Sequence, residues 1–122
     1  MPADHRIDVT ERIVYIHAWG RVTNEDLTGR RAALAADPDF RPEFDRIVYD
    51  FAGVTELEVS TETLAGLATS TLFAPSARRA VVVSSHEAFG LARMCATMAG
   101  GEDRIQVFFD HDRAMVWLKS EG

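Results

Sequence analysis

Short runs of β-branched and aromatic residues alternate with segments of helical periodicity, and this alternation constrains the fold more than any other feature. The strand-like runs cover residues 7–9, 13–19, 46–50, 78–83 and 104–109. A helical segment follows the second run and each later one, over residues 24–36, 60–73, 87–100 and 111–120. Strands that alternate with helices over short connections form parallel sheets, whereas two consecutive strands form a hairpin. The sequence therefore predicts an α/β fold with a single mixed sheet, in which an N-terminal antiparallel hairpin precedes parallel strands.

The length and composition indicate one domain over residues 1–122. Hydrophobic residues make up 47% of the chain and charged residues 26%, which is typical of globular proteins and not of disordered ones. A chain of this length buries about two thirds of its unfolded surface, so its core needs no disulfide or metal. The single cysteine, Cys95, excludes a disulfide within the chain.

Charge and hydropathy argue against nucleic acids and membranes as partners. The net charge of −6 opposes binding to a phosphate backbone. The two arginine pairs, Arg30–Arg31 and Arg78–Arg79, are expected to lie on solvated surface. No apolar run is long enough to cross a bilayer, and the N-terminus lacks the pattern of a secretory signal peptide. We therefore expect a cytoplasmic protein without a membrane span.

Polar residues mark the beginnings of the predicted helices. Thr23, Ser60 and Asp110 stand where a side-chain oxygen accepts a hydrogen bond from a free backbone amide. Ser84 lies three residues before Glu87, which is the spacing of a reciprocal capping box. These hydroxyl and carboxylate groups are therefore expected to begin helices.

Glycines are expected to end two of the strands, at Gly20 and in the turn "DFAGV" over residues 50–54. The strand ends matter because the carboxyl ends of parallel strands meet along one edge of an open α/β sheet, where ligands tend to bind. The polar turns after the strands would gather there, together with the start of the helix over residues 87–100. The predicted surface for a partner or ligand consists of Asp50, Ser84, Ser85, His86, Phe89, Gly90, Arg93, Met94 and Asp110.

The helix over residues 87–100 is apolar around most of its circumference. Phe89, Leu91, Met94 and Cys95, with alanines between them, leave it no broad polar face. A surface helix needs only one apolar stripe. The additional apolar surface implies a protein partner, a ligand cavity or burial by neighbouring helices.

No motif for catalysis, a metal or a cofactor is present. The chain has no nucleophile elbow, phosphate-binding loop or dinucleotide fingerprint. The "DHD" at residues 110–112 is a poor metal site, because adjacent residues at a helix start point in different directions and no second histidine follows at a suitable spacing. Cys95 lies in mid-helix among apolar residues, which favours an inert thiol, and His17 lies in a strand that is expected to be buried. We expect no catalytic residue, no metal ligand and no cofactor.

The segment "VYDFAGVTEL", which leads from a central strand into a helix, resembles the corresponding segment of SpoIIAA-like or STAS domains. This family includes the bacterial anti-sigma-factor antagonists, and the resemblance in the order of elements covers most of the chain. The segments "AFGLARM" and "FFDHDRAMVWL" look like those of a branch of small bacterial proteins of the STAS/SEC14 type. The resemblance implies a SpoIIAA-like fold in a bacterial protein that acts through protein–protein contacts.

In the antagonists, a partner kinase phosphorylates a serine at the start of the helix after this strand, and the phosphate switches binding off. A gapless alignment on "DFAG" places Val59, which has no hydroxyl, at the phosphorylated position. A gap of one residue would make Ser60 or Thr61 the acceptor. A phosphate there would be repelled by Glu58 and Glu62. The phospho-switch is therefore expected to be lost.

Three functions are compatible with these features. The first is a non-enzymatic regulatory module that binds another protein, or a second copy of itself as a homodimer, through the strand-end edge and the helix over residues 87–100. The second is a carrier or sensor of a small apolar or lipid-like ligand, held in a cavity beside that helix. The third is an unrecognised enzyme that uses His86, His111 or Asp50.

Overall fold

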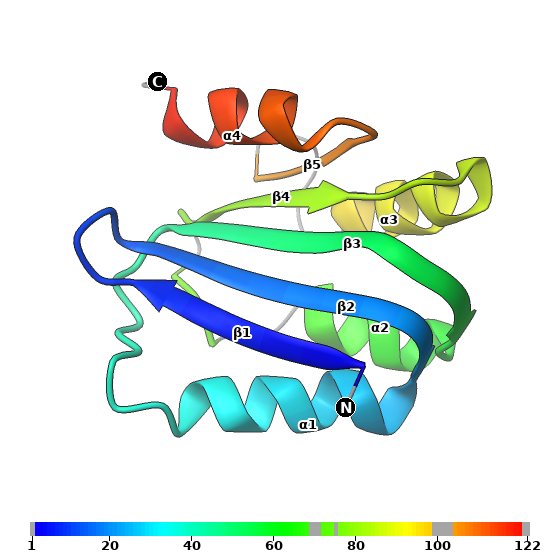
Figure 1. The fold of residues 1–122 in the computed structure, drawn as a ribbon, viewed down its shortest axis with the longest axis horizontal. Coiled ribbons are helices and arrows are strands. Elements are labelled where there is room, and N and C mark those ends of the chain that lie inside the picture. Colours follow the sequence, from blue (N-terminus) through cyan, green and yellow to red (C-terminus); the bar gives the residue numbers. More distant parts are fainter. Residues whose placement is uncertain (1, 69–71, 75, 99–103, 121–122) are drawn as a thin grey trace.

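The structure is a computed structural model that describes residues 2–68, 72–74, 76–98 and 104–120 (Figure 1). Its elements follow the order β1 (Ala3–Asp8), β2 (Ile13–Thr23), α1 (Asn24–Ala35), β3 (Arg46–Glu58), α2 (Thr61–Ala68), β4 (Arg78–Val82), α3 (His86–Met98), β5 (Ile105–Phe108) and α4 (His111–Lys119). The strands form one sheet in the order β1-β2-β3-β4-β5. β1 pairs with β2 in antiparallel fashion, and each later pair of neighbours is parallel. The predicted α/β fold with a single mixed sheet is confirmed.

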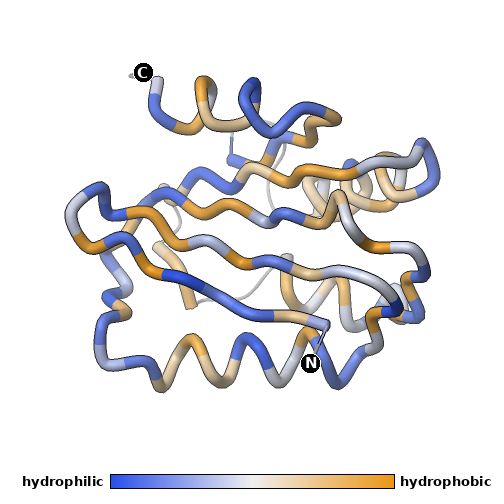
Figure 2. Tube along the Cα trace, viewed as in Figure 1, coloured by the Kyte–Doolittle hydropathy of each residue, from blue (hydrophilic) through white to orange (hydrophobic). Residues whose placement is uncertain are grey.

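Helices cover both faces of the sheet, but unequally (Figure 1). α1, α2 and α3 lie against the face that carries Ile16, Tyr49 and Val81, which we call the three-helix face. α4 lies across β3, β4 and β5 on the opposite face, which we call the α4 face. Successive side chains of a strand point to opposite faces, so Val48, which directly precedes Tyr49, belongs to the α4 face. Figure 2 shows that hydrophobic residues concentrate in the central strands between these helix layers.

β2 and β3 are longer than predicted, because neither strand ends at its glycine. Gly20 has a φ of +64° at a shift in the register, which is a β-bulge, and β2 runs on to Thr23. β3 likewise runs past Asp50 and through Gly53, so the predicted glycine turn is wrong. A Cβ at Gly53 would lie 3.2 Å from the Cβ of Trp19. Gly53 therefore allows a close approach of β2 and β3 and does not end a strand.

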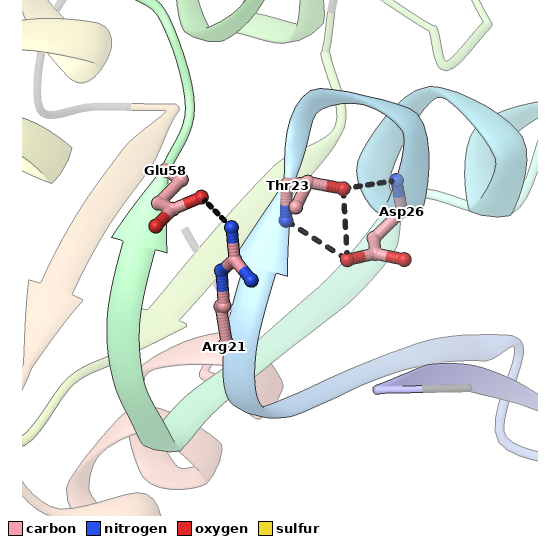
Figure 3. A network of polar contacts seen from close by, with 4 residues as sticks. All are labelled: Arg21, Thr23, Asp26 and Glu58. Carbon is pink, nitrogen blue, oxygen red and sulfur yellow. Dashed lines mark hydrogen bonds and ion pairs between the residues drawn. The ribbon is translucent and has the colours of Figure 1, made fainter.

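The far end of β2 leads directly into α1, next to the far end of β3 (Figure 3). The Thr23 hydroxyl oxygen lies 3.4 Å from the Asp26 amide and accepts its hydrogen bond, while the Thr23 amide donates to the Asp26 carboxylate at 2.8 Å. The cap predicted at Thr23 is confirmed, with Asp26 as its reciprocal partner. Arg21 and Glu58 form an ion pair across the two strands. Both side chains are exposed, so this pair contributes little to stability.

The first strand lies earlier in the chain than predicted. β1 begins at Ala3, and Val9 belongs to the turn that follows, where 54% of its surface is exposed. Burial alternates along the first part of β1, from buried Ala3 to exposed Asp4 and half-buried His5. Backbone pairing with β2 therefore holds an edge strand whose polar residues concealed it in the sequence.

One face of β2 remains open beyond the reach of α4. His17 and Trp19 are exposed, and their rings lie 4.8 Å apart. The expectation of a core histidine is wrong, since 47% of the His17 side chain is exposed and its Nδ1 lies 3.6 Å from the carboxylate of Asp4. α4 packs on β3, β4 and β5, so it leaves uncovered the part of the α4 face that His17 and Trp19 of β2 occupy.

The helices agree with the predicted segments, apart from the second. α2 ends at Ala68, whereas the predicted segment ran to residue 73; Leu72 lies outside the helix, and residues 69–71 are outside the described part of the chain. Ala114 and Leu118 of α4 are buried against the sheet. Among the described residues, no helix has the length and apolar character needed to cross a membrane.

Candidate functional site

A cavity of about 150 Å³ lies between the three-helix face of the sheet and α1, α2 and α3. Of the 21 described residues that line it, 17 are apolar or aromatic, one is a cysteine and three are arginines. The sheet contributes Ile16, Tyr49, Phe51, Val54, Leu57, Val81 and Ile105. The helices and the connecting segments contribute Leu27, Leu34, Leu64, Leu67, Leu72, Phe73, Val83, Ala88, Leu91, Ala92 and Cys95. The apolar surface of α3 that the sequence left unexplained is therefore turned, in part, toward open space.

Small residues on α3 account for this space. Ala88, Leu91, Ala92 and Cys95 all line the cavity, and their spacing of three and four places them on one face of the helix. Two alanines and a cysteine do not reach far enough to fill the gap between α3 and the sheet. The cavity is thus encoded by a stripe of side chains that are apolar but short.

Three arginines complete the lining, with no acidic residue among the part of the lining that the structure describes. Arg30 and Arg31 come from α1, and Arg79 comes from β4. The expectation that both arginine pairs lie on solvated surface is wrong for Arg79, which is only 8% exposed, and for half-buried Arg30. In the β4 pair, successive side chains point to opposite faces, so Arg79 turns toward the three-helix face while Arg78 does not.

Arg79 is engaged with the loop and helix around it. Its Nη1 lies 3.4 Å from the carbonyl oxygen of Leu67, to which it donates, and its guanidinium lies 5.3 Å from the centre of the Phe73 ring. Burial raises the pKa of the Tyr49 hydroxyl, and the positive charges of Arg79 and Arg31 act in the opposite direction. Charges from β4 and α1 therefore converge on the same side of the cavity.

Arg30 is held by a histidine and not by an acid. Its Nη1 lies 3.0 Å from Nδ1 of His5, and Nε2 of His5 lies 2.8 Å from the carboxylate of Asp37. A guanidinium only donates hydrogen bonds. Nδ1 of His5 must therefore accept, and Nε2 carries the proton that is donated to Asp37, so the imidazole is neutral in this arrangement. The hydrogen bond from His5, followed by that from the Asp39 amide, lowers the pKa of Asp37.

One donor of Arg30 has no partner. The Nε atom is buried and makes no hydrogen bond among the described residues. An unpaired buried donor loses its hydration without compensation, at a cost of about 1–3 kcal/mol. Sequence reasoning missed the Arg30–His5 contact. His5 belongs to the edge strand β1, and the strand predicted from the sequence began only at residue 7.

Cys95 lies in the cavity wall, half-buried. Burial raises the pKa of its thiol. A smaller fraction of thiolate at neutral pH makes it a weak nucleophile, which agrees with the inert thiol expected from the sequence.

The residues predicted at the strand ends lie close to one another, but none of them lines the cavity. Ser84 donates a hydrogen bond of 2.8 Å to the carbonyl of Ala52, and Asp50 pairs with Val82 across β3 and β4. Ser84 is therefore not the cap of α3. That role belongs to Ser85, whose hydroxyl oxygen accepts from the Ala88 amide at 3.1 Å.

An aromatic cluster lies beside these residues at the end of β5. The ring of Phe109 stacks on Phe89 with centroids 4.9 Å apart, and His86 meets its edge at 5.4 Å. Arg93 lies over the Phe89 ring at 5.9 Å, so His86, Phe89 and Arg93 do share a surface. Phe109 was not among the predicted residues, although an aromatic residue directly after the last strand was the available signal. It is 50% exposed.

The other predicted residues have structural positions around this cluster. Asp110 caps α4, since its carboxylate accepts from the Asp112 amide at 2.8 Å. Gly90 is exposed, and a Cβ built on it would meet no atom within 4 Å. Met94 is half-buried. Nothing in these positions requires glycine or methionine.

Ser60 caps α2 as predicted. Its hydroxyl oxygen accepts from the Thr63 amide at 3.1 Å and donates to the Thr63 hydroxyl at 3.0 Å. Val59, which the gapless alignment places at the phosphorylated position of the antagonists, packs half-buried against the core between α1, α2 and the sheet. Phosphorylation of Ser60 or Thr61 stays a prediction.

The residues considered for catalysis or for a metal are not brought together in the part of the chain that the structure describes. Within the described residues, no hydrogen bond or ion pair joins His86, His111 and Asp50 to one another. The same part of the chain contains no group of three or more histidine, cysteine or acidic residues placed to hold a metal ion.

Comparison with solved structures identifies the fold. An uncharacterised protein of the DUF3478 family from Shewanella loihica, which has a SpoIIAA-like fold, is similar to this chain with a TM-score of 0.62 and 18% sequence identity. The similarity covers 95% of this chain and 91% of the other. The fold is SpoIIAA-like. The resemblance seen in the sequence is thereby confirmed for the fold. No protein-family model and no curated protein matches the chain.

Proposed function

We propose that this SpoIIAA-like domain is a non-enzymatic binding module that holds a small apolar ligand in the cavity beneath α1, α2 and α3. The cavity itself carries the proposal: it has a volume of about 150 Å³ and an almost wholly apolar lining. Cavities of about this volume in protein cores bind benzene or xenon. The bound group is therefore about the size of one aromatic ring or a chain of about six carbons.

The packing of native interiors supports this proposal. Protein cores are packed as densely as organic crystals, and a void of this size is uncommon in a domain of 122 residues. The cavity also explains why α3 is apolar on more than one side, since Leu91 and Cys95 face the cavity while Phe89 stacks on Phe109. A ligand would restore the contacts that the short side chains of α3 leave unmade.

Cys95 provides an internal reporter for the test, because it is the only cysteine and it lines the cavity. Saturating benzene or 1-hexanol should slow the alkylation of Cys95 by iodoacetamide and raise the Tm. Ala92→Phe should remove both effects, since the ring occupies the cavity. Thr97→Phe places the same ring on an exposed position of α3 outside the lining, and both effects should persist. The proposal fails if saturating probes leave the alkylation rate and the Tm of the wild-type protein unchanged.

Native mass spectrometry gives an independent measurement on protein purified from a bacterial host. The wild-type protein should carry a small adduct that is absent from Ala92→Phe. Equal adduct levels in the two proteins would place the bound molecule elsewhere.

A second candidate function, a homodimer contact, is favoured by the stacked pair of Phe89 and Phe109. Half of the Phe109 surface is exposed, and exposed aromatic clusters mark protein contacts. Sedimentation equilibrium should then show a dimer for the wild-type protein and a monomer for Phe109→Ser, with benzene protection of Cys95 retained. A wild-type protein that stays monomeric at high concentration would eliminate this candidate and leave the ligand proposal intact.

A further inference from the structure

We infer that the ligand is a small organic acid, whose apolar tail fills the cavity and whose carboxylate binds Arg30 and Arg31 of α1. The inference rests on the proposed function and adds the chemistry of the head group and the length of the tail.

The charge of the cavity differs from that of the whole chain. The chain carries 19 acidic residues against 13 lysines and arginines, yet the charged residues of the described lining are all arginines. A concave site with apolar walls and charges of one sign concentrates ions of the opposite sign. The lining therefore selects for an anion in a protein that otherwise repels anions.

Arg30 supplies the more specific observation. It is bonded to the neutral imidazole of His5, which separates it from Asp37, so the acid does not contact the guanidinium. Its Nε is buried without a hydrogen-bond partner among the described residues. A buried donor that the protein leaves unpaired is costly. A ligand carboxylate that draws the Arg30 side chain toward the cavity would satisfy it.

The geometry of the guanidinium favours a carboxylate as the source of this oxygen. The planar fork of arginine matches the two oxygens of a carboxylate, and the resulting bonds are stronger than those between neutral groups. Arg31 follows Arg30 on α1 and also lines the cavity. Arg79 already donates to Leu67 and lies over Phe73, so it adds positive charge and is less suited to hold the head group.

The volume limits the tail. A cavity of about 150 Å³ accommodates about six carbons, which is much less than the length of a membrane lipid chain. Hexanoate and benzoate have the expected size. The inferred ligand is thus a short-chain or single-ring carboxylate.

The test compares hexanoate with 1-hexanol, which has the same tail and no charge, by calorimetry and by the protection of Cys95. Hexanoate should bind the wild-type protein about tenfold to a hundredfold more tightly, the range expected for hydrogen bonds to a charged group. Arg30→Gln should lower the affinity for hexanoate to that for 1-hexanol and leave 1-hexanol binding unchanged. Arg31→Gln, at an exposed position, serves as a second variant and should lower the same affinity. Arg113→Gln removes one charge from the exposed surface of α4 and should change neither affinity.

The outcomes separate this inference from the proposed function. Equal affinities of the wild-type protein for hexanoate and 1-hexanol would overturn the carboxylate and leave the apolar cavity site standing. Preferential binding of hexyl phosphate over hexanoate would overturn it as well. If neither hexanoate nor 1-hexanol binds, the proposed function fails together with the inference.

Discussion

The two faces of the sheet are packed to different degrees, although the same strands build both. On the α4 face, Ala114, Leu118, Ile13 and Val48 each have no exposed surface. On the three-helix face, the residues of α2 and α3 that line the cavity are all partly exposed, and about 150 Å³ between the layers is unfilled. A single sheet can therefore carry one face that α4 packs closely and another face on which a cavity lies beside fully buried residues such as Leu34 and Ile47.

The difference arises from side-chain volume and not from hydrophobicity. α4 combines Ala114 with Leu118 and, at its edges, Met115 and Trp117, so that small and large side chains together cover β3 and β4. α3 brings mostly short side chains to its side of the sheet. We expect substitutions that change volume to have opposite consequences on the two faces.

Truncation should produce the largest effect. Leu118→Ala removes a fully buried side chain from the α4 face and should lower the free energy of unfolding by about 2–5 kcal/mol. Leu91→Ala removes the same atoms beside the existing cavity, from a residue that is already partly exposed, and should cost less than half as much. Urea denaturation measures both losses. Equal losses would show that the two faces are packed alike and would remove the comparison.

Larger side chains should destabilise the α4 face more than the three-helix face. Ala114→Leu forces extra atoms into a site without exposed surface and should destabilise the protein by about 1–3 kcal/mol. Ala92→Leu, at the cavity wall, should change the free energy of unfolding by less than about 1 kcal/mol, because the new atoms enter open space. Thermal and urea unfolding of the two variants check this prediction. A strong destabilisation by Ala92→Leu would mean that the cavity is not available to a side chain.

The order of the elements and most helix caps were predictable because they depend on neighbours in the sequence. Thr23, Ser60 and Asp110 each cap the helix that directly follows them. The ends of the strands were not predictable in this way. Gly20 and Gly53 were expected to end strands, but the pairing of β2 with β3 continues past both. Whether a glycine ends a strand or permits a close approach depends on the partner strand.

The site was less predictable than the fold. The sequence placed the site residues at the strand ends, where polar turns do gather, and left open a cavity beside the helix over residues 87–100. The cavity does lie beside that helix, but its lining contains none of the residues that were predicted at the strand ends. The arginine pairs were visible as "RR" in the sequence. The burial of Arg79 depends on which of the two side chains of the β4 pair points toward the three-helix face. The empty volume depends on the summed sizes of side chains from three helices and the sheet. No local pattern contains that sum.

Substitutions of the helix caps of α2 and α4 should show the same difference between the two faces, with smaller losses of stability. Ser60→Ala and Asp110→Ala should each remove about 1 kcal/mol of stability, since each loses a hydrogen bond to a free amide. The two substitutions should differ in which part of the molecule becomes less stable. α2 borders the cavity, so Ser60→Ala should raise hydrogen exchange within α2 and speed the alkylation of Cys95. Asp110→Ala should lower global stability and leave that rate unchanged. Equal changes in the alkylation rate would contradict the separation of the two faces.

The smallest effect concerns Asp37, whose contact with His5 positions Arg30 at the edge of the three-helix face. The pKa of Asp37 is lowered in the folded protein, so its contribution to stability is complete above the unfolded value of 3.8 and is lost as the pH falls through the folded value. The urea midpoint of Asp37→Asn should therefore lie below that of the wild-type protein at pH 7, and the two midpoints should converge as the pH falls through the folded pKa of Asp37. A difference that does not depend on pH would show that the Asp37 charge is not involved. Because α4 has no part in this contact, Asp37→Asn should also weaken hexanoate binding slightly while the α4 face, reported by the fluorescence of Trp117, is unchanged.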